Sequence, residues 1–300
     1  MRIQATLLGA LLAGLPPLAT ATEKLVPARL DAPALAVPVA VLAAAPTLDG
    51  SFADWPDGGW VAVPVVPAVE NDSQNRAGRL DVQLRAGVHG DRVYLAARWP
   101  DPRADTEFKP WEWDGTRYRR GKQVDDMFAV RFDLDGDYDS CMLSDRDYRV
   151  DAWLWSAGRS DPAGYADDTW QLITTRFQEQ AAEYEGPSGK TVYIKKSRDD
   201  GEPIYENTRP DRNKFAGDRL PGIEQLPSPA GSVADVSAKG AWVDGHWQLE
   251  LSRKLDTGHA DDAVLAKGKQ RRGAIGVFER GSAEHKSVSG ELLFDFGALR

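Results

Sequence analysis

From Leu48 onward, apolar and polar residues alternate along short segments of the chain. Alternation with a period of two predicts β-strands that have one buried face. The segments with this pattern are residues 60–66, 81–88, 92–99, 127–134, 149–155, 191–195, 233–243, 246–252, 273–279 and 291–296. Two of the links between them are tight turns, Asp244-Gly245 and His89-Gly90-Asp91. Because such short links join neighbouring strands, they predict antiparallel pairing.

Two segments instead have apolar residues at helical spacing. Residues 168–184 begin with an aspartate that can cap a helix, and residues 260–267 predict a second, shorter helix. In the first segment the apolar residues are Trp170, Ile173, Phe177, Ala181 and Tyr184. Since ten strands dominate the pattern, we predict an all-β fold, an antiparallel β-sandwich with one or two short helices.

A long polar excursion separates the two halves of the pattern. Residues 185–229 are rich in Gly, Pro, Asp and Lys, and they are too long for a hairpin loop. We expect this excursion to form a lid or a docking surface.

The N-terminus has the features of a secretory signal peptide over residues 1–21. Arg2 precedes an apolar run, and Ala19-Thr20-Ala21 forms a small-x-small cleavage signal. We therefore expect a soluble, exported, periplasmic protein. Residues 22–46 are an Ala/Pro-rich leader, either loose or forming an edge strand because of its prolines. Residues 47–300 form the folded domain.

Composition excludes several classes of function. The formal net charge of −9 argues against a nucleic-acid partner. A single cysteine, Cys141, excludes intramolecular disulfides, zinc ribbons and covalent c-type haem. No hydrolase or nucleotide-binding signature is present, and no later apolar run is long enough for a membrane span. We interpret the pairs Asp125-Asp126, Asp167-Asp168 and Asp261-Asp262 as caps and turns, and expect no independent catalysis.

The most distinctive stretch is W-x-W-x-A-G-R-x-x-P-x-G-Y-A-D-D at residues 153–168. It resembles the ethylbenzene dehydrogenase-related, cytochrome c-552/DMSO reductase-like haem-binding domain, which includes the gamma subunit of ethylbenzene-dehydrogenase-type molybdoenzymes. Residues 277–289 resemble the final hairpin of the same family. The opening L-D-G-S-F-A-D-W-P at residues 48–56 resembles a wider superfamily that also contains family 9 carbohydrate-binding modules.

The resemblance implies a non-covalent haem b whose iron is bound by Met142 and Lys286. A thioether is a soft ligand that raises the reduction potential, while a lysine amine binds only after it loses its proton. His285 is adjacent to Lys286 and is the alternative ligand. Met127 is a competing thioether that we expect to fill the core.

Three further residues are candidates for contact with the haem. Trp153 and Trp155 lie on one face of their strand, so both either flank the porphyrin or fill the sandwich. Arg159 is a candidate partner for a haem propionate.

The resulting hypothesis is an exported protein that binds haem b and relays electrons, alone or as the small subunit of a periplasmic oxidoreductase. Any molybdenum would belong to a partner chain. The alternative is a carbohydrate-binding β-sandwich module without haem, in which exposed tryptophans stack on sugar rings.

Overall fold

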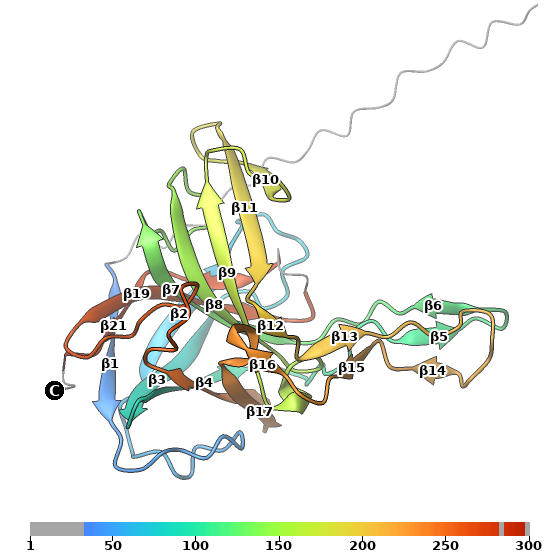
Figure 1. The fold of residues 1–300 in the computed structure, drawn as a ribbon, viewed down its shortest axis with the longest axis horizontal. Helices are drawn as coiled ribbons and strands as arrows, with labels where there is room; N and C mark the ends of the chain where they lie inside the picture. The colour runs from blue at the N-terminus through green and yellow to red at the C-terminus, as the bar shows by residue number, and fades with distance from the viewer. Residues whose placement is uncertain (1–32, 282–284, 298–300) are drawn as a thin grey trace, which may run out of the picture.

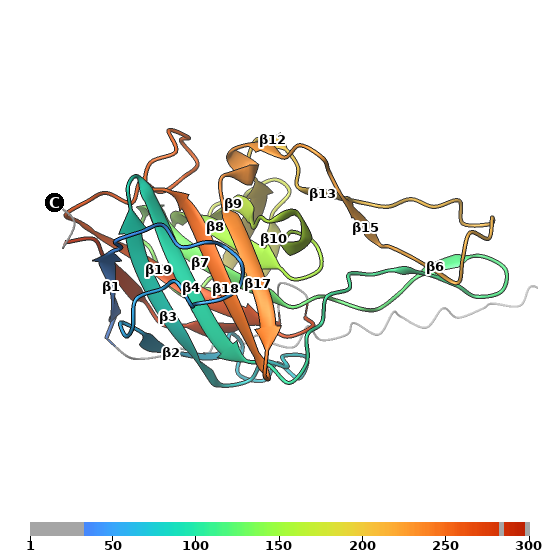
Figure 2. The ribbon, with the colours of Figure 1, turned by 90° about the horizontal axis from the view of Figure 1, so that it is seen from below.

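The computed structural model describes residues 33–281 and 285–297. A 14-stranded β-sheet folds over on itself into two packed layers (Figures 1 and 2). The order along the sheet is β10-β11-β9-β8-β7-β19-β20-β2-β3-β4-β18-β17, with β1 and β21 off this path. The strands of this sheet are β1 Leu35–Val41, β2 Val61–Pro67, β3 Leu80–His89, β4 Arg92–Pro100, β7 Met127–Gly136, β8 Tyr148–Ser156, β9 Asp167–Thr174, β10 Ala182–Glu185, β11 Thr191–Arg198, β17 Ser237–Val243, β18 His246–Lys254, β19 Gln270–Phe278, β20 Ser287–Ser289 and β21 Leu292–Asp295. The predicted all-β sandwich is confirmed.

The strands along the main path pair in antiparallel fashion, as the short turns predict. At one of these turns, between β17 and β18, Asp244 and Gly245 both have positive φ angles, which suit a tight hairpin. Strand β1, which lies in the leader, is parallel to both of its partners. Its first half pairs with β21 and its second half pairs with β3. Part of the leader is therefore a strand within the sandwich.

The apolar core lies between the two layers. One layer contains β7, β8, β9 and β19, and the other contains β2, β3, β4, β17 and β18 (Figure 2). Trp99 of β4 stacks on Phe128 of β7 with ring centroids 5.1 Å apart, and Trp155 of β8 meets Trp247 of β18 at 5.0 Å. The predicted alternation thus arises because alternate side chains fill this interior.

Neither predicted helix forms. Residues 168–184 contain β9, a turn and the start of β10. Thr169, Ile173 and Thr174 are β-branched, and β9 pairs with β8 on one side and β11 on the other, so tertiary pairing overrides the helical spacing. Residues 260–267 are irregular, because Asp262 accepts a hydrogen bond from Thr257 and the chain turns there. The helical segments of the described residues are two 3-10 turns, η1 Asp161–Ala163 and η2 Ser232–Ala234.

An arm projects from one end of the sandwich (Figures 1 and 2). Residues 103–125 and part of the predicted excursion, residues 203–226, meet in it. The short strands in and beside the arm are β5 Trp111–Trp113, β6 Tyr118–Arg120, β12 Gly201–Glu202, β13 Tyr205–Asn207, β14 Arg219–Leu220, β15 Ile223–Gln225 and β16 Ala230–Gly231. The excursion is thus divided, because its residues 191–198 form β11 of the main sheet. A role as a lid or docking surface remains a prediction.

Candidate functional site

The W-x-W motif lies on β8, and its tryptophans point into the sandwich. Trp153 and Trp155 are fully buried in the main core. The indole N–H of Trp155 donates to Asp161 Oδ1 at 2.9 Å, and the backbone N–H of Gly240 donates to the same oxygen at 2.6 Å. Both tryptophans pack in the core, and their contact with a haem stays a prediction.

The opposite side of this layer, which we call the outer face, carries the loop of residues 137–147. Arg131 points outward, because its neighbours on β7, Val130 and Phe132, belong to the main core. Its Nη2 donates to the carbonyl of Ser140 at 2.6 Å, and the Tyr148 hydroxyl donates to the carbonyl of Cys141 at 3.1 Å. These two bonds fix the loop over the outer face.

Met142 lies within this loop. Its side chain is half-buried and packs against a second apolar cluster on the outer face. The buried members of this cluster are Val69, Tyr138, Leu143, Tyr148, Val150, Ile173, Val192 and Ile194. Burial raises the pKa of both tyrosines, so their phenols stay neutral. The thioether therefore packs on an apolar cluster whose tyrosines are neutral.

Lys286 is placed on the same outer face by the strand register. Ser287 of β20 is paired with Val277, which points into the core, and Val288 is paired with Gly276. Cross-strand partners point to the same side of a sheet, so Val288 points outward and, by alternation, Lys286 does too. The Lys286 carbonyl accepts a hydrogen bond from Ala68 N–H at 2.8 Å. Ala68 adjoins Val69, a member of the cluster on which Met142 packs.

His285, the alternative ligand, has a different partner. Its Nδ1 lies 3.0 Å from both carboxylate oxygens of Asp72. His285 lies at a bend two residues before β20. The structure thus brings the segments of Met142 and Lys286 to one face, and pairs His285 with an aspartate.

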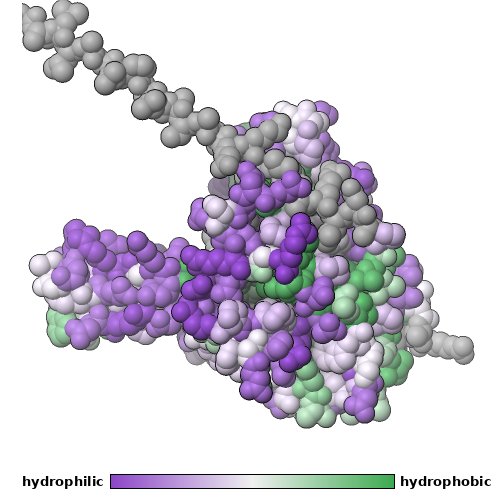
Figure 3. Space-filling view, turned by 180° about the vertical axis from the view of Figure 1, so that it is seen from behind, coloured by the Kyte–Doolittle hydropathy of each residue, from purple (hydrophilic) through white to green (hydrophobic). Residues whose placement is uncertain are grey.

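Small residues form the outer face beneath these segments. Ala129 of β7 is paired with Gly276 of β19, and Ala152 of β8 is paired with Arg131. A Cβ added to Gly276 would first meet the Phe278 ring at 3.5 Å, which is an ordinary contact distance. Seen from behind, the molecule has an apolar hollow surrounded by hydrophilic side chains (Figure 3).

Arg131 is a candidate that the sequence reasoning missed. It is buried on the outer face, and among the described residues its Nη1 has no hydrogen-bond partner. A buried guanidinium with an unused N–H favours an anionic or carbonyl partner. The signal in the sequence was a single cation inside the apolar run of residues 127–132.

Arg159 already has a carboxylate partner. Its guanidinium lies 3.1 Å from Asp125, and its Nη2 lies 2.6 Å from the Met127 sulfur. Met127 is buried, as expected for a core residue. The opening motif is likewise structural, because the indole N–H of Trp55 donates to buried Glu250 at 2.7 Å.

Comparison of the sequence with models of known protein families identifies the family of this chain. A family model described as ethylbenzene dehydrogenase matches residues 53–289. The chain belongs to the ethylbenzene dehydrogenase family. The matched range contains the W-x-W motif, Met142 and Lys286. The similarity to this family is therefore not limited to residues 153–168 and 277–289 but covers most of the folded domain.

Solved structures are similar only in outline to this member of the ethylbenzene dehydrogenase family. A family 9 carbohydrate-binding module from Caldicellulosiruptor kristjanssonii, in complex with glucose, has 11% identity and a TM-score of 0.38, over 87% of this chain and 95% of that one. A putative carbohydrate-binding protein from Bacteroides uniformis has 11% identity and a TM-score of 0.41, over 87% and 99%. No curated protein matches significantly. In the described part of the chain, no helix has the length and apolar character needed to cross a membrane.

Proposed function

We propose that this chain binds one haem b non-covalently on the outer face and relays electrons as an exported subunit, without catalysis of its own. Membership of the ethylbenzene dehydrogenase family supports a molybdoenzyme-associated subunit. The proposed periplasmic location rests on the signal peptide predicted for residues 1–21, which lie outside the described residues.

One observation carries the proposal. The register of β19 and β20 turns Lys286 toward the same face that the Met142 loop covers. The loop of Met142 and the segment of Lys286, which are far apart in sequence, thus lie on the same face of this layer, and the face includes the small residues Ala129 and Gly276. This donor set and this setting fit a low-spin haem.

Each side chain has a distinct task in the proposal. Met142 offers a neutral sulfur from a loop tethered to β7 and β8, and Lys286 offers its amine in the neutral form. Arg131 offers its unused N–H to a carboxylate such as a propionate. The bound haem would supply a reversible one-electron change, whose potential depends on these ligands and on burial.

The test is an absorption spectrum of the mature chain reconstituted with haemin. We expect a low-spin, six-coordinate spectrum in the wild type, because two strong ligands leave no position for water. Met142→Ala and Lys286→Ala should each give a high-spin or five-coordinate spectrum. His285→Ala should leave the spectrum nearly unchanged.

Matched controls separate ligand loss from general damage. Met127→Leu removes the buried competing thioether, and Lys254→Ala removes an exposed lysine at the end of β18. Both should keep the wild-type spectrum. A low-spin spectrum that depends on His285 and not on Lys286 would move the ligation to the histidine. A wild-type chain that takes up no haem would refute the proposal.

The carbohydrate-binding alternative has less support in the side chains. Stacking on sugars needs exposed aromatic rings, whereas of the ten tryptophans only Trp242 is exposed, at 38%. The other nine are buried or half-buried. If haem does not bind, calorimetric titration with glucose oligosaccharides is the experiment that tests this alternative.

A further inference from the structure

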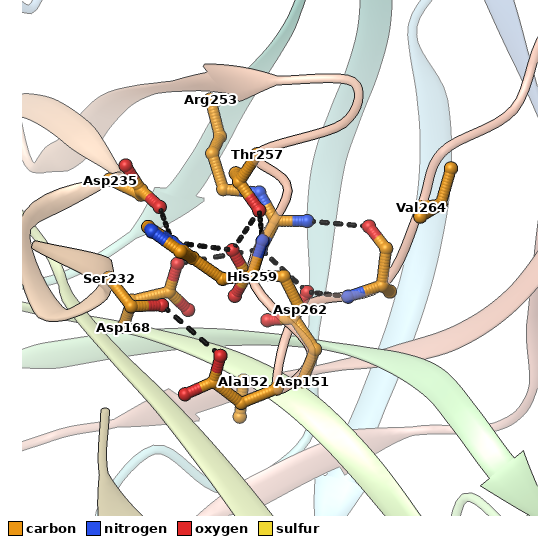
Figure 4. Close-up of polar contacts among 12 residues, drawn as sticks. Asp151, Ala152, Asp168, Ser232, Asp235, Arg253, Thr257, His259, Asp262 and Val264 are labelled. Atoms are coloured by element: carbon orange, nitrogen blue, oxygen red, sulfur yellow. Dashed lines mark hydrogen bonds and ion pairs between the residues drawn. The ribbon is translucent and has the colours of Figure 1, made fainter. Parts of the chain in front are cut away.

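The pairs Asp167-Asp168 and Asp261-Asp262 contribute to a buried cluster of carboxylates, so they are not simple caps or turns. Arg253 of β18 is fully buried, and its Nη1 lies 2.7 Å from Asp151, 3.4 Å from Asp168 and 3.1 Å from Asp262 (Figure 4). Its Nη2 donates to the carbonyl of Ala263 at 2.7 Å. One cation is thus surrounded by three acidic side chains inside the sandwich.

Beside this ion cluster lies a second group of carboxylates, which shares Asp262 with it and adds Asp199 and Asp261. Carboxylate oxygens of Asp199, Asp261 and Asp262 lie within 4.8 Å of one another. Asp199 is only 6% exposed, and neither of its oxygens has a hydrogen-bond partner among the described residues. The Ser232 hydroxyl adjoins the group and donates to Asp261 at 3.4 Å.

A buried carboxylate without a partner is costly, so it takes up either a proton or a cation. Burial raises the pKa of Asp199 to about 8, and the neighbouring aspartates Asp261 and Asp262 add to the rise. Burial also raises the pKa of Asp262 to about 6, although Arg253 opposes the change. Protons neutralise carboxylates one at a time. Three carboxylates whose oxygens lie this close together can instead be neutralised by one cation that binds all three.

The ligand atoms decide the class of ion. Two oxygens bound to Ca²⁺ at about 2.3–2.6 Å lie at most about 5 Å apart, so all three carboxylates can reach one ion. Zn²⁺ prefers nitrogen and sulfur ligands, and the nearby His259 instead pairs through Nδ1 with Asp235 at 2.7 Å. Mg²⁺ retains several waters and rarely occupies a site made of protein groups alone.

We propose that Asp199, Asp261 and Asp262 form a structural Ca²⁺ site that is independent of the proposed haem. Asp199 directly follows β11, where the chain leaves the sheet toward the arm. Ser232 lies in η2, where the chain returns, and the two other aspartates lie in the loop after β18. The ion therefore fastens the start of residues 200–231, part of which lies in the arm, to the loop after β18, and Ser232 at the end of this segment donates to one of the ligands, Asp261.

Thermal unfolding of the full mature chain tests the site. After treatment with EDTA, addition of CaCl₂ should raise Tm by about 5 °C, and MgCl₂ should raise it less. Calorimetric titration with CaCl₂ should give one site per chain. Asp199→Asn should remove the Ca²⁺-dependent shift. This variant should still fold in EDTA, with a Tm at or above that of the wild type, because an amide relieves the charge repulsion.

The control is Asp200→Asn, which changes the exposed neighbour of Asp199 and should keep the full Ca²⁺-dependent shift. Three results would overturn the proposal. They are a wild-type Tm that responds to pH but not to Ca²⁺, an unchanged shift in Asp199→Asn, or an equal loss in Asp200→Asn. The first result would mean that protons alone neutralise the cluster.

Discussion

Individual carboxyl groups set much of the electrostatic character of this sandwich. Asp101, Asp126 and Glu279 form another buried group, with oxygens within 4.8 Å of one another. Unlike Asp199, Asp126 accepts hydrogen bonds, from Trp247 Nε1 at 3.1 Å and from Asp105 N–H at 2.8 Å. Burial raises the pKa of Asp126 to about 7, and burial together with Asp101 raises that of Glu279 to about 7. This group is therefore expected to hold protons.

The raised pKa of Glu279 predicts a pH-dependent stability. The folded state keeps a proton that the unfolded state releases near pH 4.5, so the free energy of unfolding falls as pH rises from about 4.5 to 7. One such proton contributes a slope of up to about 1.4 kcal/mol per pH unit. Glu279→Gln should flatten this slope and stabilise the fold at pH 8, measured by urea unfolding at several pH values. Glu70→Gln, at an exposed position, should behave as wild type, and equal slopes in all three proteins would contradict the assignment.

The strands that could be predicted from the sequence are those in which alternation and pairing agree. β3, β4 and β18 could be predicted from the sequence, because each buries one face completely. Short turns join β3 to β4 and β17 to β18. β9 could not, because its apolar residues match a helical spacing and only its pairing with β8 and β11 makes it a strand. Local pattern carries no information about that pairing.

Close packing between β17 and β8 gives a test at this scale. A Cβ on Gly240 would overlap the ring of Trp155, which is fully buried and cannot move aside. Gly240→Ala should therefore destabilise the fold by about 1–3 kcal/mol, measured by urea unfolding. Gly276→Ala in β19 is the matched control, since its Cβ would meet only ordinary contacts, and it should change stability by less than about 1 kcal/mol. Equal effects of the two substitutions would be inconsistent with this packing.

At the scale of the whole molecule, the candidate site depends on contacts between distant segments. The family resemblance predicted Met142 and Lys286 from the sequence. The register of β20 and the tethered loop 137–147, which bring them to one face, have no local signature. The same holds for Arg131 and Asp199, because each is an ordinary charged residue until the fold buries it, Arg131 with one unpaired nitrogen and Asp199 with two unpaired oxygens among the described residues.

The arm predicts where a protease first attacks. Arg117 directly precedes β6, and Arg212 and Lys214 come shortly before β14; all three are exposed, and both strands lie in the arm (Figure 1). Limited digestion with trypsin should therefore cut after these residues and leave the two layers of the sandwich associated, as judged by mass spectrometry and gel filtration. First cuts within β3, β4 or β18 would show that the arm is not the most accessible part of the chain.

The parallel strand β1 has a consequence for how the chain reaches its native state. β1 lies near the N-terminus, yet four of its seven residues pair with β21, close to the C-terminus. Contacts between such distant positions make folding slow, since a large loop must close before they form. During synthesis, the emerging chain cannot complete its sheet until its last strand has left the ribosome. The chain therefore remains incompletely folded for longer, which is the state that a polypeptide needs if it is translocated unfolded through a protein channel.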